Sequence, residues 1–295
     1  VAKVAQLIIP QASPEACAET EMHALREDVR RGVGLLKAGR HKDARVALER
    51  ALLGFDASPN APAGEGESVS RTRVAFDALE ALSDICGALG DFSAALQHGD
   101  RAVALLDRPA AEVQWPALDR LRRRGLLCFS LGHAAFAAGD GDCSGDGVAG
   151  GPPEATCYDK RRLGYWRQAA EAMMQHRGDP ASEGHILHEV GMLLADRAAG
   201  DEAAIDEAAE LLSSAAARLG RARRVALAGS GAAPARALEP RDEVRGLRLL
   251  RREMACHVAL TRLLWVSDEA EARVELERAQ PLLDLVPLSP EPALA

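Results

Sequence analysis

Aromatic residues are scarce in this chain. They make up 3% of its 295 residues, although apolar residues as a whole make up 47%. A core with so few Phe, Tyr and Trp side chains has to be built from Ala, Leu and Val, and Ala and Leu are good helix formers. No strand-like alternation of apolar and polar residues stands beside the helical patterns. The composition therefore predicts an all-α fold.

Three further absences restrict the function. Uninterrupted apolar runs of about 18 residues are lacking, so we expect no membrane-spanning segment. A basic surplus is lacking as well: the net charge is −8, which argues against nonspecific binding of nucleic acid, because neutralising phosphates requires Lys and Arg in excess. The six cysteines show no paired short spacing, which indicates buried thiols in a reducing compartment, and we predict a cytoplasmic location. Cys143 and Cys157 could still pair across the glycine-rich segment between them.

Catalytic and cofactor motifs are also lacking. The sequence holds no Gly-x-Ser-x-Gly elbow, no phosphate-binding loop and no dinucleotide fingerprint, so we expect neither an enzyme nor a bound cofactor. Residues 140–145 match the first half of a calcium-binding loop, but Gly151 stands where a bidentate Glu is needed. His185 and His188 share a helical face without a recognisable third zinc ligand. We therefore expect no metal site.

What the chain does have is a recurring spacing of small residues. Ala44, Leu48 and Ala51 follow Gly39 by five, nine and twelve residues. The same offsets recur after Gly90 and after Ser267. Small residues at these points allow two antiparallel helices to approach closely around a tight turn. The positions that we expect to be structural are Gly32, Gly39, Ala44, Ala51, Gly90, Ala95, Ala102, Gly132, Gly139, Gly191, Ala208, Ala272 and Ala279.

This spacing resembles that of the tetratricopeptide repeat family, whose unit carries a small residue on a first helix, a turn, and small and large residues on a second helix. The resemblance implies an antiparallel helix-pair solenoid of about ten or more helices that binds other proteins. In the chaperone-binding members of that family, Lys and Asn on the first helices clamp a terminal carboxylate. The matching positions here hold other residue types, which disfavours that clamp: Val29, Val33, Ala81, Leu126 and Ser130.

Segments rich in Pro, Gly and Ser interrupt the helical patterns and predict where the helices begin and end. We expect one repeat domain over residues 1–295, with loop insertions at 56–70 and 139–153 and a proline-rich tail at 281–295. After a first helical pair between Ser13 and Asp56, the expected helices cover 71–89, 92–106, 118–138, 158–176, 182–198, 203–227, 240–265 and 268–280, with a connector at 109–116.

Arginines supply the candidate binding surface. Arg241, Arg245, Arg248 and Arg252 recur at steps of three and four residues, which places them along one stripe of a helix. Such a stripe can hold an acidic peptide or a phosphate group. The alternative is a solvated helix face whose charges are balanced by Glu239, Asp242 and Glu253.

Two functional hypotheses remain open. The first is a noncatalytic scaffold that binds a peptide or helix of a partner protein in a multi-subunit assembly. The second is the helical regulatory C-terminal domain of a larger enzyme, as in SET/MYND lysine methyltransferases. The second is kept because the sequence begins with Val1 instead of an initiator Met, from which we expect a processed or excised piece. The sequence does not identify the partner.

Overall fold

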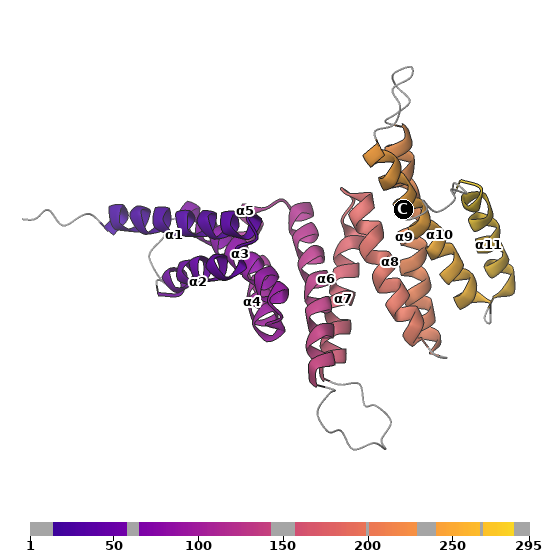
Figure 1. Cartoon of the computed structure of the whole chain (residues 1–295), viewed down its shortest axis with the longest axis horizontal. Coiled ribbons are helices and arrows are strands. Elements are labelled where there is room, and N and C mark those ends of the chain that lie inside the picture. Colours follow the sequence, from indigo (N-terminus) through magenta and orange to yellow (C-terminus); the bar gives the residue numbers. More distant parts are fainter. Residues whose placement is uncertain are drawn as a thin grey trace, which may run out of the picture. The chain divides into compact units, whose positions relative to one another are not determined.

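The fold is helical throughout the residues that the structure, a computed structural model, describes: 14–57, 65–142, 157–198, 201–228, 240–265 and 268–285. Eleven α-helices and no strand occur in these ranges, which confirms the predicted all-α class of antiparallel helix pairs. No helix among them is long and apolar enough to cross a membrane. The helices are α1 (Pro14–Lys37), α2 (His41–Ala57), α3 (Glu65–Ala88), α4 (Phe92–Leu106), α5 (Pro109–Gln114), α6 (Ala117–Asp142), α7 (Cys157–Gln175), α8 (Pro180–Arg197), α9 (Glu202–Ala228), α10 (Pro240–Leu264) and α11 (Glu269–Leu283) (Figure 1).

The chain divides into two compact units. The first comprises residues 1–120 and 130–162, and the second comprises residues 121–129 and 163–295. Helices α6 and α7 therefore contribute residues to both units. The expectation of one repeat domain over the whole chain stays a prediction.

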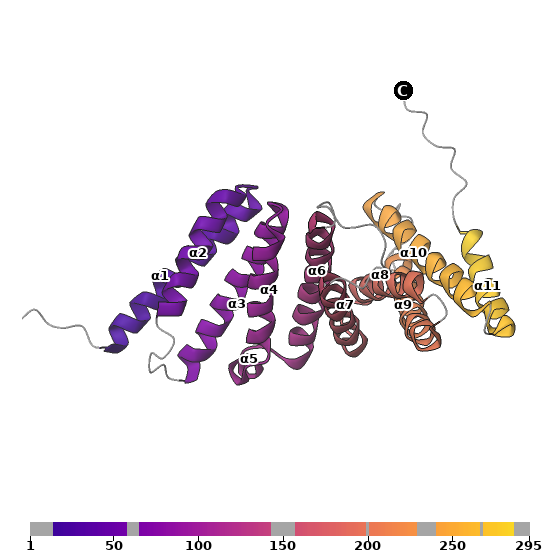
Figure 2. The same cartoon turned by 90° about the horizontal axis from the view of Figure 1, so that it is seen from below.

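Two helical hairpins form most of the first unit, and each turns at a glycine (Figure 2). Gly39 has φ +72° and Gly90 has φ +78°, a left-handed conformation that side chains disfavour. After α1, the Arg40 N–H donates to the Leu35 carbonyl at 2.9 Å, and after α3 the Asp91 N–H donates to the Cys86 carbonyl at 2.8 Å. These are the hydrogen bonds of a glycine-terminated helix, and they return the chain for the second helix of each pair.

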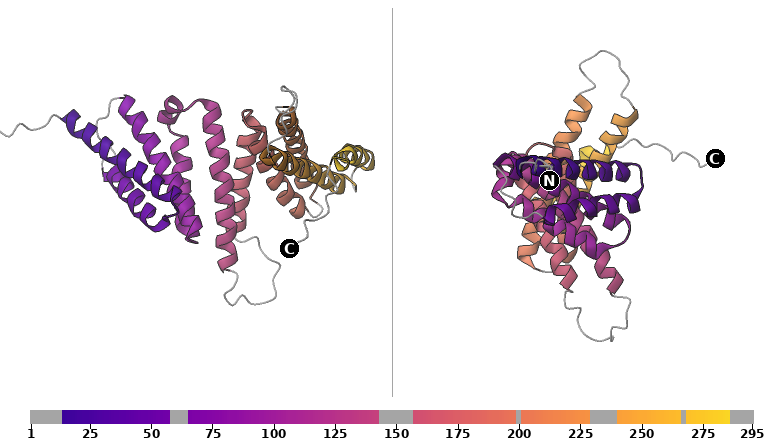
Figure 3. Two further views of the ribbon diagram at one scale, coloured as in Figure 1. Left: turned by 45° about the horizontal axis from the view of Figure 1, so that its top comes forward. Right: turned by 90° about the vertical axis from the view of Figure 1, so that its left-hand side faces the viewer.

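Small residues set the distance between the paired helices. Gly32 on α1 faces Leu48 on α2 so closely that a Cβ atom would lie 2.5 Å from the Leu48 Cγ. Ala44, Ala51, Ala95 and Ala102 are all buried, as the repeated spacing predicts. The pair α1 and α2 is the indigo pair that lies together in both views of Figure 3. The core of this unit also holds an edge-to-face contact between Phe76 and Trp115, whose ring centroids are 5.3 Å apart.

The second unit repeats this packing from α8 to α11, which contact one another in chain order. Gly184 and Gly191 on α8 lie against Leu219 and Leu212 of α9, and a Cβ atom at either glycine would lie 2.8 Å from the leucine Cγ. Two aspartates precede α8 and α9 and accept hydrogen bonds from their first turns: Asp179 accepts from the Ser182 N–H, and Asp201 accepts from the Ala203 N–H. The remaining predicted structural positions that the structure describes here are buried, namely Ala208, Ala272 and Ala279.

A buried ion-pair network holds α8 and α9 together. Glu183, 2% exposed, accepts from the Arg218 Nε at 3.0 Å and lies 2.7 Å from the His176 Nδ1. The Asp179 N–H also donates to the Glu183 carboxylate, at 2.8 Å. Arg218 in turn donates to the Met174 carbonyl at 2.9 Å, so that every charge in this network has a buried partner.

Several predicted boundaries are corrected. Helix α3 begins at Glu65, inside the predicted loop at 56–70, and α6 continues to Asp142, inside the predicted insertion at 139–153. The predicted connector at 109–116 contains the short helix α5, in which Pro109 at the first turn requires no N–H partner. Helix α11 continues through Pro281 to Leu283, so the predicted tail begins too early. Ser267, Cys143 and the glycine-rich residues 143–156 lie outside the described part of the chain.

Candidate partner-binding site

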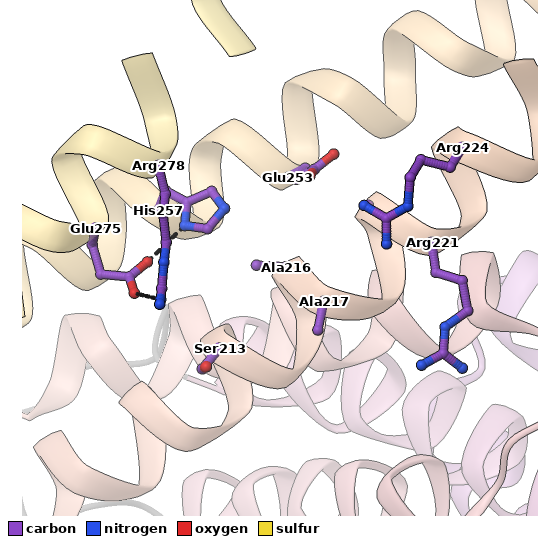
Figure 4. A pocket seen from close by; sticks show the side chains of 10 residues that line it. Ser213, Ala216, Ala217, Arg221, Arg224, Glu253, His257, Glu275 and Arg278 are labelled. Atoms are coloured by element: carbon purple, nitrogen blue, oxygen red, sulfur yellow. Dashed lines mark hydrogen bonds and ion pairs between the residues drawn. The ribbon is translucent and has the colours of Figure 1, made fainter. Parts of the chain in front are cut away.

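A solvent-open cavity lies between α9, α10 and α11, wholly within the second unit. It has a volume of about 350 Å³. Helix α9 supplies its floor, α10 supplies Glu253 and His257, and α11 supplies Glu275 and Arg278 (Figure 4). Sequence reasoning did not identify this site.

The floor exists because one stripe of α9 carries almost no side chain. Ser213, Ala216, Ala217 and Gly220 recur at steps of three, one and three residues, which places them on one helical face. Gly220 also allows α10 to approach, since a Cβ atom there would lie 2.6 Å from the Glu253 Oε1. The small side chains therefore leave the space that larger residues on this face would fill.

Glu253 is buried and paired with an arginine of α9. The Arg223 Nε donates to the Glu253 Oε2 at 2.7 Å, and the Arg223 Nη2 donates to the Oε1 at 3.4 Å. A buried carboxylate without such a partner would lose several kcal/mol of solvation, so this pair is what permits Glu253 to line the cavity. Burial raises the pKa of the neighbouring Cys256 thiol to about 12, and the negative charge of Glu253 contributes less to this shift.

Glu275, on α11, is held by two cationic or polar partners. Its Oε2 lies 2.6 Å from the His257 Nδ1, and its Oε1 accepts from the Arg278 guanidinium. The His257 contact ties α11 to α10, whereas the Arg278 contact lies within α11, and both are drawn as dashed lines in Figure 4. Both carboxylates of the cavity are therefore neutralised by groups that surround them.

Arg221 and Arg224 complete the lining at the opposite end of the cavity from Glu275 (Figure 4). Both are exposed, and neither forms an ion pair within the described residues. Because Glu253 and Glu275 already have cationic partners, these two guanidiniums give the cavity a surplus of positive charge. The surplus stands out in a chain whose net charge is −8.

The arginine stripe predicted from the sequence lies on the other flank of α10. Arg245 and Arg248 are exposed, Arg252 is half-buried, and the side chain of Arg241 lies outside the described part. The neighbouring His188, and more weakly the charges of His185 and Arg252, lower the pKa of Glu189 on α8. Arg252 is thus the member of the stripe whose charge acts on α8, whereas His257 of α10 contacts α11.

The proposed local partners of this stripe are only partly described. Glu253 pairs with Arg223 of α9 and not with the stripe, which corrects that part of the alternative interpretation. Glu239 and the side chain of Asp242 lie outside the described residues. The role of the stripe in binding stays a prediction.

His185 and His188 lie beside Glu189, as their spacing suggests. The His185 Nδ1 is 3.6 Å and the His188 Nδ1 is 3.5 Å from the Glu189 Oε1. His185 also makes an edge-to-face contact with Phe129, with ring centroids 5.7 Å apart. Among the described side chains, no group of three or more His, Cys, Asp and Glu lies close enough together to hold a metal ion.

Comparison with known proteins adds structural likeness only. Neither a known protein family nor a curated protein matches the sequence. A kinesin light chain-like protein of Podosopora anserina with nearly identical tetratricopeptide-like repeats aligns with 91% of this chain and 99% of its own, at 16% identity and a TM-score of 0.46. A circular tandem repeat protein aligns with 92% of this chain and 59% of its own, at 16% identity and a TM-score of 0.32.

The assignment of the fold rests on the geometry of this chain itself. Helices are paired, two of the turns have a left-handed glycine, and Ala44 and Ala95 are buried five residues after those glycines. The described residues thus form antiparallel helix pairs that repeat one spacing of small residues.

Proposed function

We propose that this chain is a noncatalytic scaffold that binds a peptide or helix of a partner protein within a multi-subunit assembly. Folds made of stacked helix pairs generally serve protein interaction, because each pair adds surface without requiring a new core. The observation that supports this function most directly is the exposed arginine charge on α9 and α10 that has no ion-pair partner among the described residues. Charged groups of this kind steer and orient partners.

The predicted arginine stripe belongs to this proposal as one contact surface. Arg245 and Arg248 present their guanidiniums to solvent on α10, and Arg241 and Arg252 continue the stripe in sequence. A guanidinium binds a carboxylate through two parallel hydrogen bonds, which gives direction as well as affinity. A cytoplasmic location and the lack of nucleic-acid binding are part of the same proposal, and the buried free thiols of Cys86, Cys128 and Cys256 agree with a reducing compartment.

Affinity purification of the full chain from extracts of its own cells, followed by mass spectrometry, tests this function. We expect a partner protein to be enriched at a constant ratio to the chain. The Arg245→Gln/Arg248→Gln variant should recover less of it, because two charged contacts are removed. The control variant Arg31→Gln/Arg50→Gln removes two exposed charges of the first unit and should recover it unchanged. A chain that enriches no protein above an unrelated bait would contradict the proposal.

A further inference from the structure

We propose that the cavity between α9, α10 and α11 is a binding site for an acidic side chain of a partner peptide, held by Arg221 and Arg224. This inference rests on the proposed scaffold function and gives it a second contact surface with a defined chemistry. The site is separate from the arginine stripe, because no residue of the stripe lines the cavity.

Charge complementarity identifies the occupant as an anion. Each carboxylate of the cavity has a cationic partner, Arg223 for Glu253 and Arg278 for Glu275. Arg221 and Arg224 have no ion-pair partner within the described residues, so the lining carries two uncompensated positive charges. A cavity wall excludes part of the surrounding water, which strengthens the attraction of these guanidiniums for an entering anion.

The size and the walls of the cavity favour a carboxylate on a short aliphatic stem. A volume of about 350 Å³ accommodates one or two side chains and little more. Ala216 and Ala217 place methyl groups on the floor, against which the methylene groups of a Glu side chain can pack. A phosphoserine side chain has one methylene group for this contact, whereas a Glu side chain has two. We therefore assign the occupant as a glutamate-rich segment of a partner protein.

The test uses the full chain and a fluorescein-labelled glutamate-rich peptide, with fluorescence anisotropy as the readout. We expect saturable binding that weakens as salt is added, because salt screens exposed charges. The same peptide with glutamine in place of every glutamate should not bind. A phosphoserine peptide without carboxylates should bind more weakly than the glutamate peptide, and tighter binding of the phosphopeptide would overturn the assignment to a carboxylate.

Two cavity variants and one matched control locate the site. Arg221→Gln/Arg224→Gln removes the uncompensated charges, and we expect the affinity to fall about three- to tenfold. Ala217→Leu fills the cavity from an exposed position of α9 without changing the charge, and it should reduce the affinity by a similar factor. Arg31→Gln/Arg50→Gln removes the same amount of charge from exposed positions of the first unit and should change the affinity less than twofold. Circular dichroism confirms that each variant is folded.

The outcomes separate this inference from the proposed function. Equal losses in the two arginine variants would show unspecific attraction to positive charge, and unchanged binding by Ala217→Leu would show that the peptide does not enter the cavity. Either result overturns the cavity site. The scaffold function would then still stand if the affinity purification of the wild-type chain enriches a partner, and it would fall if no partner is enriched.

Discussion

The close approach of α1 and α2 at Gly32 can be tested with two glycines of the same helix. A Cβ atom at Gly32 would lie 2.5 Å from the Leu48 Cγ and 2.7 Å from its Cδ2. Leu48 is fully buried at 0% exposure, so its side chain cannot turn out into solvent without losing its packing in the core. A Cβ atom at Gly34, two residues further along α1, meets no atom within 4 Å. The same substitution should therefore have opposite effects at the two positions.

The magnitudes follow from two competing contributions. Replacing a helical glycine with alanine stabilises a protein by about 0.5–1 kcal/mol, because the unfolded chain loses conformational freedom. At Gly34 this gain stands alone. At Gly32 the forced contact with Leu48 costs about 1–3 kcal/mol, as overpacking does in other cores. We expect Gly34→Ala to raise the free energy of unfolding by about 0.5–1 kcal/mol and Gly32→Ala to lower it by up to roughly 2.5 kcal/mol.

Urea denaturation followed by circular dichroism measures both free energies, and hydrogen exchange shows which helices are affected. Gly32→Ala should increase exchange in α1 and α2, while Gly34→Ala should not. If Gly32→Ala stabilised the chain as much as Gly34→Ala does, α1 and α2 would not approach each other at this point. The helix pairing described for the first unit would then be wrong.

Three further predictions concern other parts of the chain. Ala44→Leu and Ala95→Leu each add three carbon atoms at positions no more than 1% exposed, and each should lower the free energy of unfolding by about 1–3 kcal/mol; unchanged melting in both would contradict the repeat spacing. The pKa of Cys256 is raised to about 12, so the folded state keeps a thiol proton that the unfolded chain releases near 9. Stability should therefore fall as pH rises above about 9, by up to roughly 1.4 kcal/mol per pH unit for this group, and Cys256→Ala should show a shallower decline in urea denaturation across that range. Asp179 caps the N-terminus of α8, so Asp179→Ala should lower the free energy of unfolding by about 1 kcal/mol, measured by urea denaturation. Asp179→Asn should retain most of the stability, because its side-chain oxygen can still accept the capping hydrogen bonds. Equal losses of stability in the two variants would show that the charge of Asp179 matters more than its hydrogen bonds.

Local spacing explains why the helix pairs could be predicted from the sequence. The turn at Gly39 and the burial of Ala44 depend on residues only five apart, and the same holds for Gly90 and Ala95. The third copy of the spacing, after Ser267, differs from the first copy in its burial. Leu276 occupies the position of buried Leu48 but is 49% exposed, because no described helix packs against that face of α11. Burial at this position depends on a neighbour that the spacing itself does not supply.

The candidate site could not be predicted because it requires three helices to meet. The floor of the cavity comes from α9, while Glu275 and Arg278 come from α11, more than fifty residues further along the chain. Small residues at Ser213, Ala216, Ala217 and Gly220 are typical of a close approach or of open space on one face of a helix, but their spacing does not indicate which helix lies opposite. The stripe at Arg245 and Arg248 was found because four arginines recur within one helix.

The central claim, that this chain binds a partner protein through its stacked helices, is tested most directly by photo-crosslinking from those helices. A photoactivatable amino acid is introduced at Ala217 in the cavity and, in separate preparations, at Arg245 on the stripe and at Arg50 in the first unit. The crosslinked peptides from native extracts are then identified by mass spectrometry. The account predicts that Ala217 crosslinks to a glutamate-rich segment of one partner protein, while Arg50 does not crosslink to that segment. Crosslinks confined to the chain itself, from Ala217 and Arg245 alike, would contradict the claim.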